Sequence, residues 1–255
     1  MKKNFMPVKS ADRVFDILEL LAQQKNGIHI RELGKQLNIA DSSIHALVHT
    51  MLQRRFLKMD GNRRIWLGSK VYEFSNIVSA DPLLKFSKPV MKEIKQRFNQ
   101  NVHLAVLDGL DVVYIAYEES NQPIRYHMEV GKVQSAHVTG LGKMLLSSFS
   151  DDQIKKLYQN YVFEKLTPTT IDSVNKLVKE LNQIRQRGYS IDDAESYKGC
   201  KCFAAPIYDR YDKMIASVSI SIPFFTDEDA QREPELILTV KEAANRISLL
   251  LKENV

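Results

Sequence analysis

The sequence predicts an α+β protein of two domains, a helical domain with a short hairpin and a larger domain built around an antiparallel sheet. Helical periodicity fills the first third of the 255 residues, and only residues 56–67 read as a hairpin there. After residue 101, strand-like runs joined by tight turns take over, with helices between them. Antiparallel hairpins mixed with helices favour a sheet that helices cover. Pro82 marks the boundary between the two parts, because the residue before a proline avoids helical geometry.

Three helices are predicted at the start of the chain, over residues 10–23, 29–37 and 42–53. In each of them apolar residues recur at intervals of three and four, which places them on one face that is stable only when it is buried. Asn38-Ile39-Ala40 supplies a short turn between the second helix and the third. The apolar face of the third helix comprises Ile44, Leu47, Val48, Met51 and Leu52.

A hairpin is predicted directly after the third helix. Residues 56–59 and 64–67 are strand-like, and Asp60-Gly61-Asn62 between them is a strong turn signal, because glycine accepts the left-handed backbone that such turns require. A helix-turn-helix followed by a hairpin is the layout of a winged helix, which places its third helix in the major groove of DNA. The alternative is an ordinary amphipathic helix whose polar face meets only water.

The polar face of the third helix and the arginines near the hairpin are the candidate DNA contacts. Side chains on the helix would face base edges, while the arginines would meet phosphates. The expected contacts are Ser42, Ser43, His45, Ala46, His49, Arg54, Arg63 and Arg64. Residues 1–80 hold 13 Lys and Arg against 7 Asp and Glu, whereas the remainder holds 23 against 24. The positive excess therefore lies with the predicted helix-turn-helix, as a polyanionic partner requires.

The composition indicates the setting in which the protein works. The chain is 44% hydrophobic and 26% charged, which is ordinary for a globular protein. Residues 1–10 lack the apolar segment of a signal peptide, and no run is long enough to cross a bilayer, so no membrane association is expected. The two cysteines, Cys200 and Cys202, cannot form a disulfide framework. We expect a reducing, cytoplasmic setting.

The second domain is predicted to follow a helical linker over residues 69–81. A helix over residues 83–98, kinked or interrupted at Pro89, would lead into the sheet. The expected strands are residues 102–107, 112–117, 124–130, 202–208 and 214–222. The other expected helices are residues 141–149, 151–161, 171–187 and 233–252. Gly188 is expected to end the third of these as a left-handed cap.

A set of motifs, taken in chain order, resembles the IclR family of bacterial transcriptional regulators. In the first domain the motifs are Ser10-x-x-Arg13 and Ser42-Ser43-Ile44-His45. In the second domain they are the segments 137–143, 188–195, 199–206 and 217–223. Asp41 and Ala46 depart from the family pattern, which usually has a basic residue and an arginine at these positions.

The resemblance implies a function and an assembly. It makes residues 1–68 a winged helix-turn-helix DNA-binding domain, residues 69–81 a helical linker, and residues 82–255 a ligand-sensing and oligomerisation domain related to GAF and profilin-like folds. The protein would bind a double-stranded DNA operator as a homodimer or a dimer of dimers. It would be a ligand-responsive regulator of transcription and not an enzyme, and it would need no cofactor.

Carried over to this sequence, the effector site of the family comprises Gly140, Leu141, Asp192, Cys202, Ser219 and Ser221. Ser219 and Ser221 lie two residues apart on a predicted strand and therefore share a face. The turn before a helix presents free N–H groups that can hold an anion. These features predict a small organic acid as the effector. The alternative is that serine and cysteine merely fill the core of a sheet with satisfied hydroxyls.

Two alternatives of other classes involve the cysteines. Cys202 with His103, His127 or His137 would form a nucleophile and its base in an enzyme, but no local signature places a histidine beside the cysteine. Cys200, Cys202, His127 and His137 would form a zinc site, but their spacing matches no structural zinc pattern. We therefore expect neither a catalytic site nor a metal site.

Overall fold

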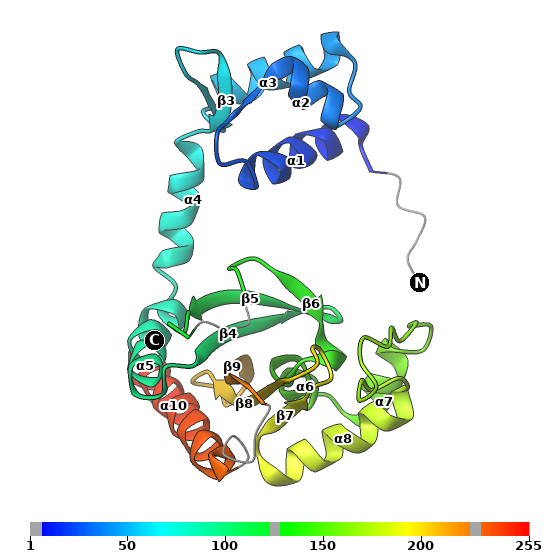
Figure 1. The fold of residues 1–255 in the computed structure, drawn as a ribbon, viewed down its shortest axis with the longest axis vertical. Helices are drawn as coiled ribbons and strands as arrows, with labels where there is room; N and C mark the ends of the chain where they lie inside the picture. Colours follow the sequence, from blue (N-terminus) through cyan, green and yellow to red (C-terminus); the bar gives the residue numbers. More distant parts are fainter. Residues whose placement is uncertain (1–6, 123–127, 225–230, 255) are drawn as a thin grey trace. The chain divides into compact units, whose positions relative to one another are not determined.

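A computed structural model of the chain describes residues 7–122, 128–224 and 231–254 (Figure 1). The chain divides into two compact units, Met1–Ala80 and Asp81–Val255. Each unit has a core of buried apolar side chains of its own, as expected of separate domains. In the described ranges, no helix is both long and apolar enough to span a membrane.

The first unit combines three helices with a small sheet, which confirms the predicted winged helix-turn-helix. The helices are α1 (Lys9–Ala22), α2 (Ile30–Gln36) and α3 (Asp41–Gln53). The strands, in their order across the sheet, are β1 (Ile28–His29), β3 (Arg64–Leu67) and β2 (Leu57–Met59). Ile17, Leu33 and Ile44 are fully buried among the helices. The sequence did not predict β1, because a strand of two residues has no periodicity to read.

The close packing of α2 against α3 depends on Gly34. A Cβ atom at this position would lie 3.1 Å from Cγ2 of Ile44 and 3.2 Å from the carbonyl oxygen of Ile39, closer than ordinary contacts. Asn38, in the turn between the helices, has a φ of 51°. Asparagine adopts this left-handed conformation more readily than most residues do. The geometry of the helix-turn-helix therefore rests on turn chemistry as well as on apolar periodicity.

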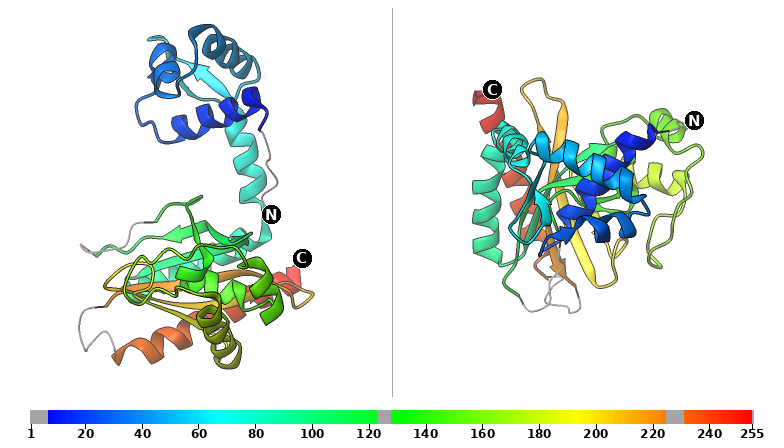
Figure 2. Two further views of the ribbon diagram at one scale, coloured as in Figure 1. Left: turned by 90° about the vertical axis from the view of Figure 1, so that its right-hand side faces the viewer. Right: turned by 90° about the horizontal axis from the view of Figure 1, so that it is seen from above.

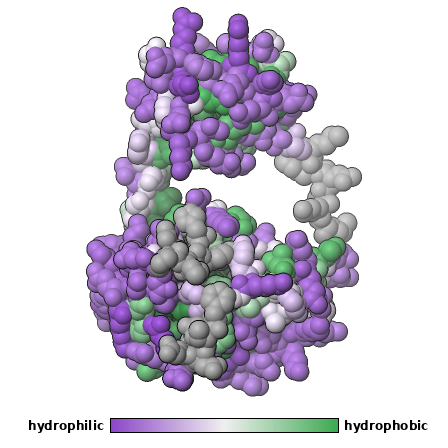
Figure 3. Space-filling model, in the orientation of Figure 1, coloured by the Kyte–Doolittle hydropathy of each residue, from purple (hydrophilic) through white to green (hydrophobic). Residues whose placement is uncertain are grey.

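The helix α4 (Lys70–Ser79) follows the small sheet and has no buried residue. Its side chains Tyr72, Phe74, Ile77 and Val78 are all exposed. Hydrophilic residues cover most of the surface visible in Figure 3. Four apolar side chains of this helix of ten residues are therefore exposed to solvent.

The second unit is a six-stranded antiparallel sheet with helices on both faces (Figures 1 and 2). The strand order is β6-β5-β4-β9-β8-β7. The strands are β4 (Asn101–Asp108), β5 (Asp111–Glu118), β6 (Val133–Ser135), β7 (Ser190–Asp193), β8 (Cys200–Tyr208) and β9 (Met214–Pro223). One face is covered by α5 (Pro82–Phe98) and α10 (Glu233–Asn254). The other carries the 3-10 helix η1 (Ala136–Val138), α6 (Gly140–Leu146), α7 (Asp151–Leu157) and α8 (Val174–Arg187).

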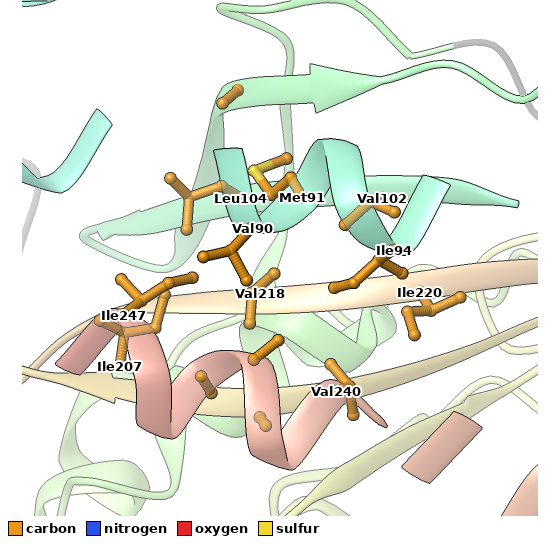
Figure 4. Packing of buried hydrophobic residues seen from close by; sticks show 14 of the residues in the cluster. Val90, Met91, Ile94, Val102, Leu104, Ile207, Val218, Ile220, Val240 and Ile247 are labelled. Atoms are coloured by element: carbon orange, nitrogen blue, oxygen red, sulfur yellow. The ribbon is translucent and has the colours of Figure 1, made fainter. Parts of the chain in front are cut away.

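The apolar core beneath α5 and α10 explains why the serines of β9 lie on the opposite face of the sheet. Apolar side chains of these two helices interdigitate with those of β4, β8 and β9 (Figure 4). On β9 the buried residues that join this core are Ala216, Val218, Ile220 and Ile222. Because successive side chains of a strand point to opposite faces, Ser219 and Ser221 lie on the face that α6 covers. The alternation thus sends the hydroxyl groups toward the predicted effector site.

Several expectations for the second unit need correction. Of the strand expected at residues 124–130, residues 124–127 lie outside the described part, and residues 128–130 are not in a strand. The third strand is instead β6, and β7 was not predicted at all. The helix α5 runs through Pro89 without interruption. The left-handed cap at Gly188 is confirmed by its φ of 76°.

Candidate DNA-binding and effector sites

The helix α3 presents the polar face that the sequence predicted. Its side chains Ser42, His45, Ala46 and His49 are exposed, and Ser43 is half-buried. The opposite face is buried through Ile44, Val48 and Met51. A helix held by one face and free on the other can enter a DNA groove without disturbing the core of its domain.

The turn of the wing is built by Asp60 rather than by a left-handed glycine. Oδ1 of Asp60 accepts hydrogen bonds from the N–H groups of Asn62 and Arg64, both at 2.9 Å, and Oδ2 accepts from Nε1 of Trp66 at 3.0 Å. These bonds, led by the one from the Arg64 backbone, lower the pKa of Asp60. Arg63 takes the left-handed conformation, with a φ of 57°. Hairpin loops of three residues often end in this way.

The three predicted arginine contacts have different environments. Arg54, at the end of α3, and Arg63, in the wing, are exposed to solvent. Arg64 is half-buried, and its Nη1 donates to the carbonyl oxygens of Asn26 and Gly27, both at 3.1 Å. Arg64 therefore ties the wing to the loop before β1. This role could not be predicted from the sequence, because the two carbonyl groups lie far from Arg64 along the chain.

A narrow cavity of about 20 Å³ lies on the α6 side of the large sheet. All six residues of the predicted effector site line it, namely Gly140, Leu141, Asp192, Cys202, Ser219 and Ser221. Seven further lining residues were not predicted, namely His103, Tyr114, Met128, Gln134, Thr139, Ser196 and Cys200. The structure thus brings the predicted residues together and adds polar groups on the walls between them.

The register of the sheet explains why some of these residues were missed. His103 on β4 lies opposite Ser219 on β9, and Cys202 on β8 lies opposite Ser221. Pairings between strands so far apart leave no mark in a single sequence, so His103 had no detectable signal. Cys200 did have one, because residues two apart on a strand share a face, here the face of Cys202.

Asp192 is buried, and both of its oxygens are engaged. Oδ1 accepts from the N–H groups of Glu195 at 2.7 Å and Ser196 at 3.3 Å, and Oδ2 accepts from the hydroxyl of Ser196. Burial raises the pKa of Asp192, although Lys143 and these hydrogen bonds oppose the shift. Asp192 therefore shapes the loop between β7 and β8 in addition to lining the cavity.

A buried ion pair lies next to Asp192. Nζ of Lys143 contacts Oε1 of Glu195, and the two side chains are 0% and 9% exposed. Burial raises the pKa of Glu195 to about 7, because it outweighs the opposing effect of Lys143. Within the described part of the chain, Oε2 of Glu195 has no hydrogen-bond partner. Two buried carboxyl groups, those of Asp192 and Glu195, thus lie near one ammonium group.

Three threonines hold the loop that carries Glu195. Oγ1 of Thr170 donates to the carbonyl oxygen of Glu195 at 2.7 Å, and Oγ1 of Thr167 does so at 3.2 Å. Thr169 donates to the carbonyl oxygen of Ala194 at 2.9 Å. Ala194 has a φ of 56°, an uncommon conformation for a residue with a Cβ atom. The surrounding hydrogen bonds account for how the loop keeps this conformation.

The protonation states of Cys202 and His103 disfavour the alternative in which Cys202 is a nucleophile. Sγ of Cys202 lies 2.9 Å from Oγ of Ser221, which lies 3.3 Å from Nδ1 of His103. Burial lowers the pKa of His103 to about 3. The contact with Cys200, followed by burial, raises the pKa of Cys202. A protonated thiol beside a neutral imidazole is the opposite of the thiolate that a nucleophile requires.

The zinc alternative has no geometric support in the part of the chain that the structure describes. No three His, Cys, Asp or Glu side chains there are grouped to hold a metal ion. His127 lies outside the described residues. His137 is buried against the rings of Tyr158, Tyr161 and Phe163, with centroids 6.2, 5.2 and 4.9 Å away. Burial, with a smaller effect of Lys143, lowers the pKa of His137 to about 4.

A larger hollow of about 1000 Å³ lies elsewhere on the second unit, and much of it is open to solvent. Arg185, Lys213 and Lys241 are among the residues that line it. None of the predicted effector residues does so. We therefore place the candidate effector site in the smaller cavity, where the polar groups converge.

Comparison with known proteins identifies both units. The IclR helix-turn-helix domain matches residues 10–61, and the bacterial transcriptional regulator IclR C-terminal domain matches residues 75–249. The transcriptional repressor IclR of Escherichia coli (strain K12) is 30% identical over 246 residues, which cover 95% of this chain and 89% of that protein. The acetate operon repressor of Salmonella typhimurium is 31% identical over 246 residues, with coverage of 95% and 89%.

Solved structures agree with these matches. The crystal structure of Thermotoga maritima IclR has a TM-score of 0.80 at 26% identity and covers 96% of this chain and 100% of that one. An IclR homologue from Microbacterium hydrocarbonoxydans, complexed with 4-hydroxybenzoate, has a TM-score of 0.83 at 19% identity, covers 96% and 100%, and supports the fold alone. The chain belongs to the IclR family of bacterial transcriptional regulators, which are DNA-binding proteins with a C-terminal effector domain and not enzymes.

Proposed function

We propose that a small organic acid binds in the cavity beside α6 and changes the affinity of the first unit for a DNA operator. The observation that carries this proposal is the convergence of Gly140, Leu141, Asp192, Cys202, Ser219 and Ser221 on one cavity. A bound ligand can act on DNA binding only by the difference in its affinity for two conformations of the protein. Such differences are commonly ~1–3 kcal/mol, a 5- to 150-fold effect.

The groups around the cavity support an acid held by neutral donors. Gly140 and Leu141 bring the N–H groups of the first turn of α6, and Ser219 and Ser221 bring hydroxyl groups. No Lys or Arg is found among the described residues that line the cavity. A carboxylate there would depend on hydrogen bonds rather than on an ion pair. The complex of the Microbacterium hydrocarbonoxydans homologue with 4-hydroxybenzoate, an organic acid, is consistent with this ligand class.

Asp192 is compatible with an anionic ligand only in one of two states. A second negative charge beside an ionised carboxylate is repelled, so either Asp192 is protonated or it accepts a hydrogen bond from a ligand hydroxyl. Burial raises the pKa of Asp192, while Lys143 and the hydrogen bonds that Asp192 accepts oppose the rise, so an ionised Asp192 requires a ligand that donates a hydroxyl to it. The effector we expect is therefore an acid that carries hydroxyl or keto oxygens.

On the DNA side we infer that α3 enters a major groove. Ser42, Ser43, His45, Ala46 and His49 would face base edges, and Arg54 and Arg63 would meet phosphates. The assignment is supported by the positive balance of residues 1–80 and by the exposure of these side chains, of which only Ser43 is half-buried. Residues 1–68 would then serve DNA binding, residues 69–81 the linkage, and residues 82–255 ligand sensing and oligomerisation.

The functional protein would be a homodimer or a dimer of dimers. One helix-turn-helix reads only a short half-site, so specificity requires two heads whose centres are separated by ~34 Å or a multiple of it. Exposed apolar side chains on α1 and α4 support a contact between copies of the chain. These side chains are Phe15 on α1 and Tyr72, Phe74, Ile77 and Val78 on α4. Sedimentation that shows only monomer at micromolar concentration, with and without operator DNA, would refute this assembly.

The test measures operator affinity by fluorescence anisotropy, with DNA from upstream of the protein's own gene and of the neighbouring operon. Each organic acid that the neighbouring pathway processes is added in turn. The double variant Ser219→Ala/Ser221→Ala should lose the response to the active acid and keep ligand-free DNA binding. Lys241→Ala, in the larger hollow, should keep both. A response that persists in the double variant would place the site elsewhere, and no DNA binding at low salt would refute the DNA assignment.

A further inference from the structure

We propose that Gln134 and Tyr197 form a latch over the cavity beside α6, a role that rests on the proposed function because it controls access to the same site. The cavity has a volume of about 20 Å³, which is room for about one water molecule. Cavities that hold small organic ligands are commonly ~300–1000 Å³. One wall of the cavity must therefore move before an organic acid can bind.

Much of the cavity wall belongs to elements that cannot move easily. His103, Cys202 and the two lining serines lie on β4, β8 and β9, and each of these strands has a paired strand on both sides. Gly140 and Leu141 begin α6, whose residues are all buried. Movement of these elements would disrupt the apolar core that α6 shares with the sheet. The wall that moves must therefore belong to another element.

Gln134 marks the side of the cavity that is nearest to solvent. Gln134 and Cys202 are half-buried, whereas the other described residues that line the cavity are buried. Cys202 lies on a central strand, but Gln134 belongs to β6, which has three residues and forms an edge of the sheet. An edge strand is hydrogen-bonded to a neighbour on one side only. The part of the wall that β6 supplies is therefore the part that moves most easily.

Hydrogen bonds hold the Gln134 side chain from two directions. Its Oε1 accepts from the hydroxyl of Tyr114 at 2.7 Å, and its Nε2 donates to the hydroxyl of Tyr197 at 3.4 Å. Tyr114 lies on β5, next to β6, whereas Tyr197 belongs to the loop between β7 and β8, at the other end of the strand order. The bond to Tyr197 thus joins the two sides of the cavity. It is also the weaker of the two bonds, because 3.4 Å is long for a hydrogen bond of this kind.

The loop that carries Tyr197 is fixed on both sides of this residue. Before it, the N–H group of Ser196 donates to Oδ1 of Asp192 at 3.3 Å. After it, the carbonyl oxygen of Gly199 accepts from the N–H group of Phe224 at 2.9 Å. The Tyr197 side chain itself is 38% exposed. Release of the latch therefore requires a rotation of this side chain and a shift of β6, while the ends of the loop stay in place.

The cysteines of the chain report on the state of the latch. The chain has two of them, and both line the cavity. The test treats the full, reduced chain with N-ethylmaleimide and measures by mass the rate at which Cys202 is labelled. This reagent is too large for a cavity of about 20 Å³, so it reacts only when the latch is released. The labelling rate then reports the fraction of chains that are open. We expect labelling to be much slower than in the chain unfolded by urea.

Two variants weaken the latch while they keep the bulk of its side chains. Tyr197→Phe removes the bond to Gln134, and Gln134→Met removes both hydrogen bonds of the glutamine. We expect Tyr197→Phe to raise the labelling rate by about 2- to 10-fold, the effect of one net hydrogen bond, and Gln134→Met to raise it at least as much. Tyr211→Phe, at an exposed tyrosine between β8 and β9, is the matched control and should label like wild type.

Low concentrations of urea separate release of the latch from unfolding. Local opening exposes little surface, so its rate of labelling should change little with urea, whereas labelling through global unfolding rises steeply. Circular dichroism checks that each variant is folded.

Three results would overturn the proposal. They are wild-type labelling as fast as that of the unfolded chain, labelling of either latch variant no faster than that of Tyr211→Phe, and a urea dependence as steep as that of global unfolding. Because neither DNA nor an organic acid enters the measurement, failure of the latch is distinguishable from failure of the proposed function, which the anisotropy measurement tests.

Discussion

Lys143 and Glu195 form an ion pair in which the lysine side chain is fully buried and the glutamate side chain is only 9% exposed. Removal of one partner of such a pair typically costs about 3–5 kcal/mol, because the other charge is left uncompensated. Lys143 also opposes the rise that burial causes in the pKa of the neighbouring Asp192, so its ammonium group acts on two carboxyl groups.

We therefore expect Lys143→Met to destabilise the second unit by about 3 kcal/mol or more. Glu195→Gln should cost less, because Asp192 remains to balance Lys143. Urea unfolding of the full chain measures both. Lys176→Met is the control, because its ion pair with Asp172 has side chains that are 64% and 34% exposed and should contribute less than about 1 kcal/mol. A larger loss for Glu195→Gln than for Lys143→Met would contradict this account.

His137 should make the second unit less stable in acid. Its folded pKa of about 4 lies below the ordinary value of 6.5, so the unfolded chain binds more protons between these two pH values. The contribution of His137 is present above pH 6.5 and is lost as the pH falls toward 4. His137→Phe, which keeps an aromatic ring against Tyr158 and Phe163, should remove this dependence. The difference in unfolding free energy between wild type and variant, measured across this range, checks the prediction.

Glu195 should act with the opposite sign. Its folded pKa of about 7 lies above the ordinary value of 4.5, so the folded protein binds more protons between these pH values and loses stability as the pH rises through them. The free energy of unfolding of Glu195→Gln relative to wild type should therefore increase from pH 4.5 to 7. A flat difference would show that the carboxyl ionises as freely in the fold as in the unfolded chain.

Two glycines of α6 should respond differently to the same substitution. A Cβ atom at Gly142 would lie 2.2 Å from the carbonyl oxygen of Ala136, which is backbone and cannot move aside. At Gly140 the nearest atoms, of Asp192 and Cys202, are 3.5 Å away, an ordinary contact. We expect Gly142→Ala to unfold or strongly destabilise the second unit, and Gly140→Ala to fold and to reduce effector binding by narrowing the cavity. Thermal unfolding and calorimetry together test the pair.

The arginines of the wing should separate DNA binding from folding. Arg63→Ala removes an exposed charge and should weaken binding to all duplexes alike, with a salt slope reduced by about 1. Arg64→Ala should instead lower the stability of the first unit, because the side chain bonds to the carbonyls of Asn26 and Gly27. Anisotropy at several salt concentrations and thermal unfolding tell the two apart. An unchanged melting temperature for Arg64→Ala would contradict this structural role and would support the predicted contact of Arg64 with DNA phosphates.

The elements that the sequence predicted are those with local signals. The helices α1, α2 and α3 each carry about two to four turns of apolar periodicity. The predicted hairpins have recognisable turn residues between their strands. The strands β1, β6 and β7 were missed because they have two, three and four residues and are defined by their partners in the sheet. In the wing the predicted position of the turn was right, but glycine does not take the left-handed conformation there. Arg63 takes it instead, and the side chain of Asp60 holds the turn by hydrogen bonds to backbone N–H groups.

The candidate site divides in the same way. Its six expected residues came from a resemblance between motifs, and only the shared faces of Ser219 with Ser221 and of Cys200 with Cys202 followed from strand geometry. His103 enters the cavity because β4 lies beside β9, a pairing set by the fold of the whole unit. The hydrogen bonds of Asp192 and the burial of Lys143 likewise depend on a loop whose path the sequence does not disclose.

The hydrogen bonds of Asp192 connect the cavity to the buried ion pair. Its two oxygens accept from three donors, and all three belong to Glu195 and Ser196. A carboxylate can accept about four hydrogen bonds, so Oδ2 keeps room for one more donor, such as a ligand hydroxyl. The same segment carries Glu195, the partner of Lys143 in α6. A ligand on Asp192 would therefore share its acceptor with the segment that forms the buried ion pair.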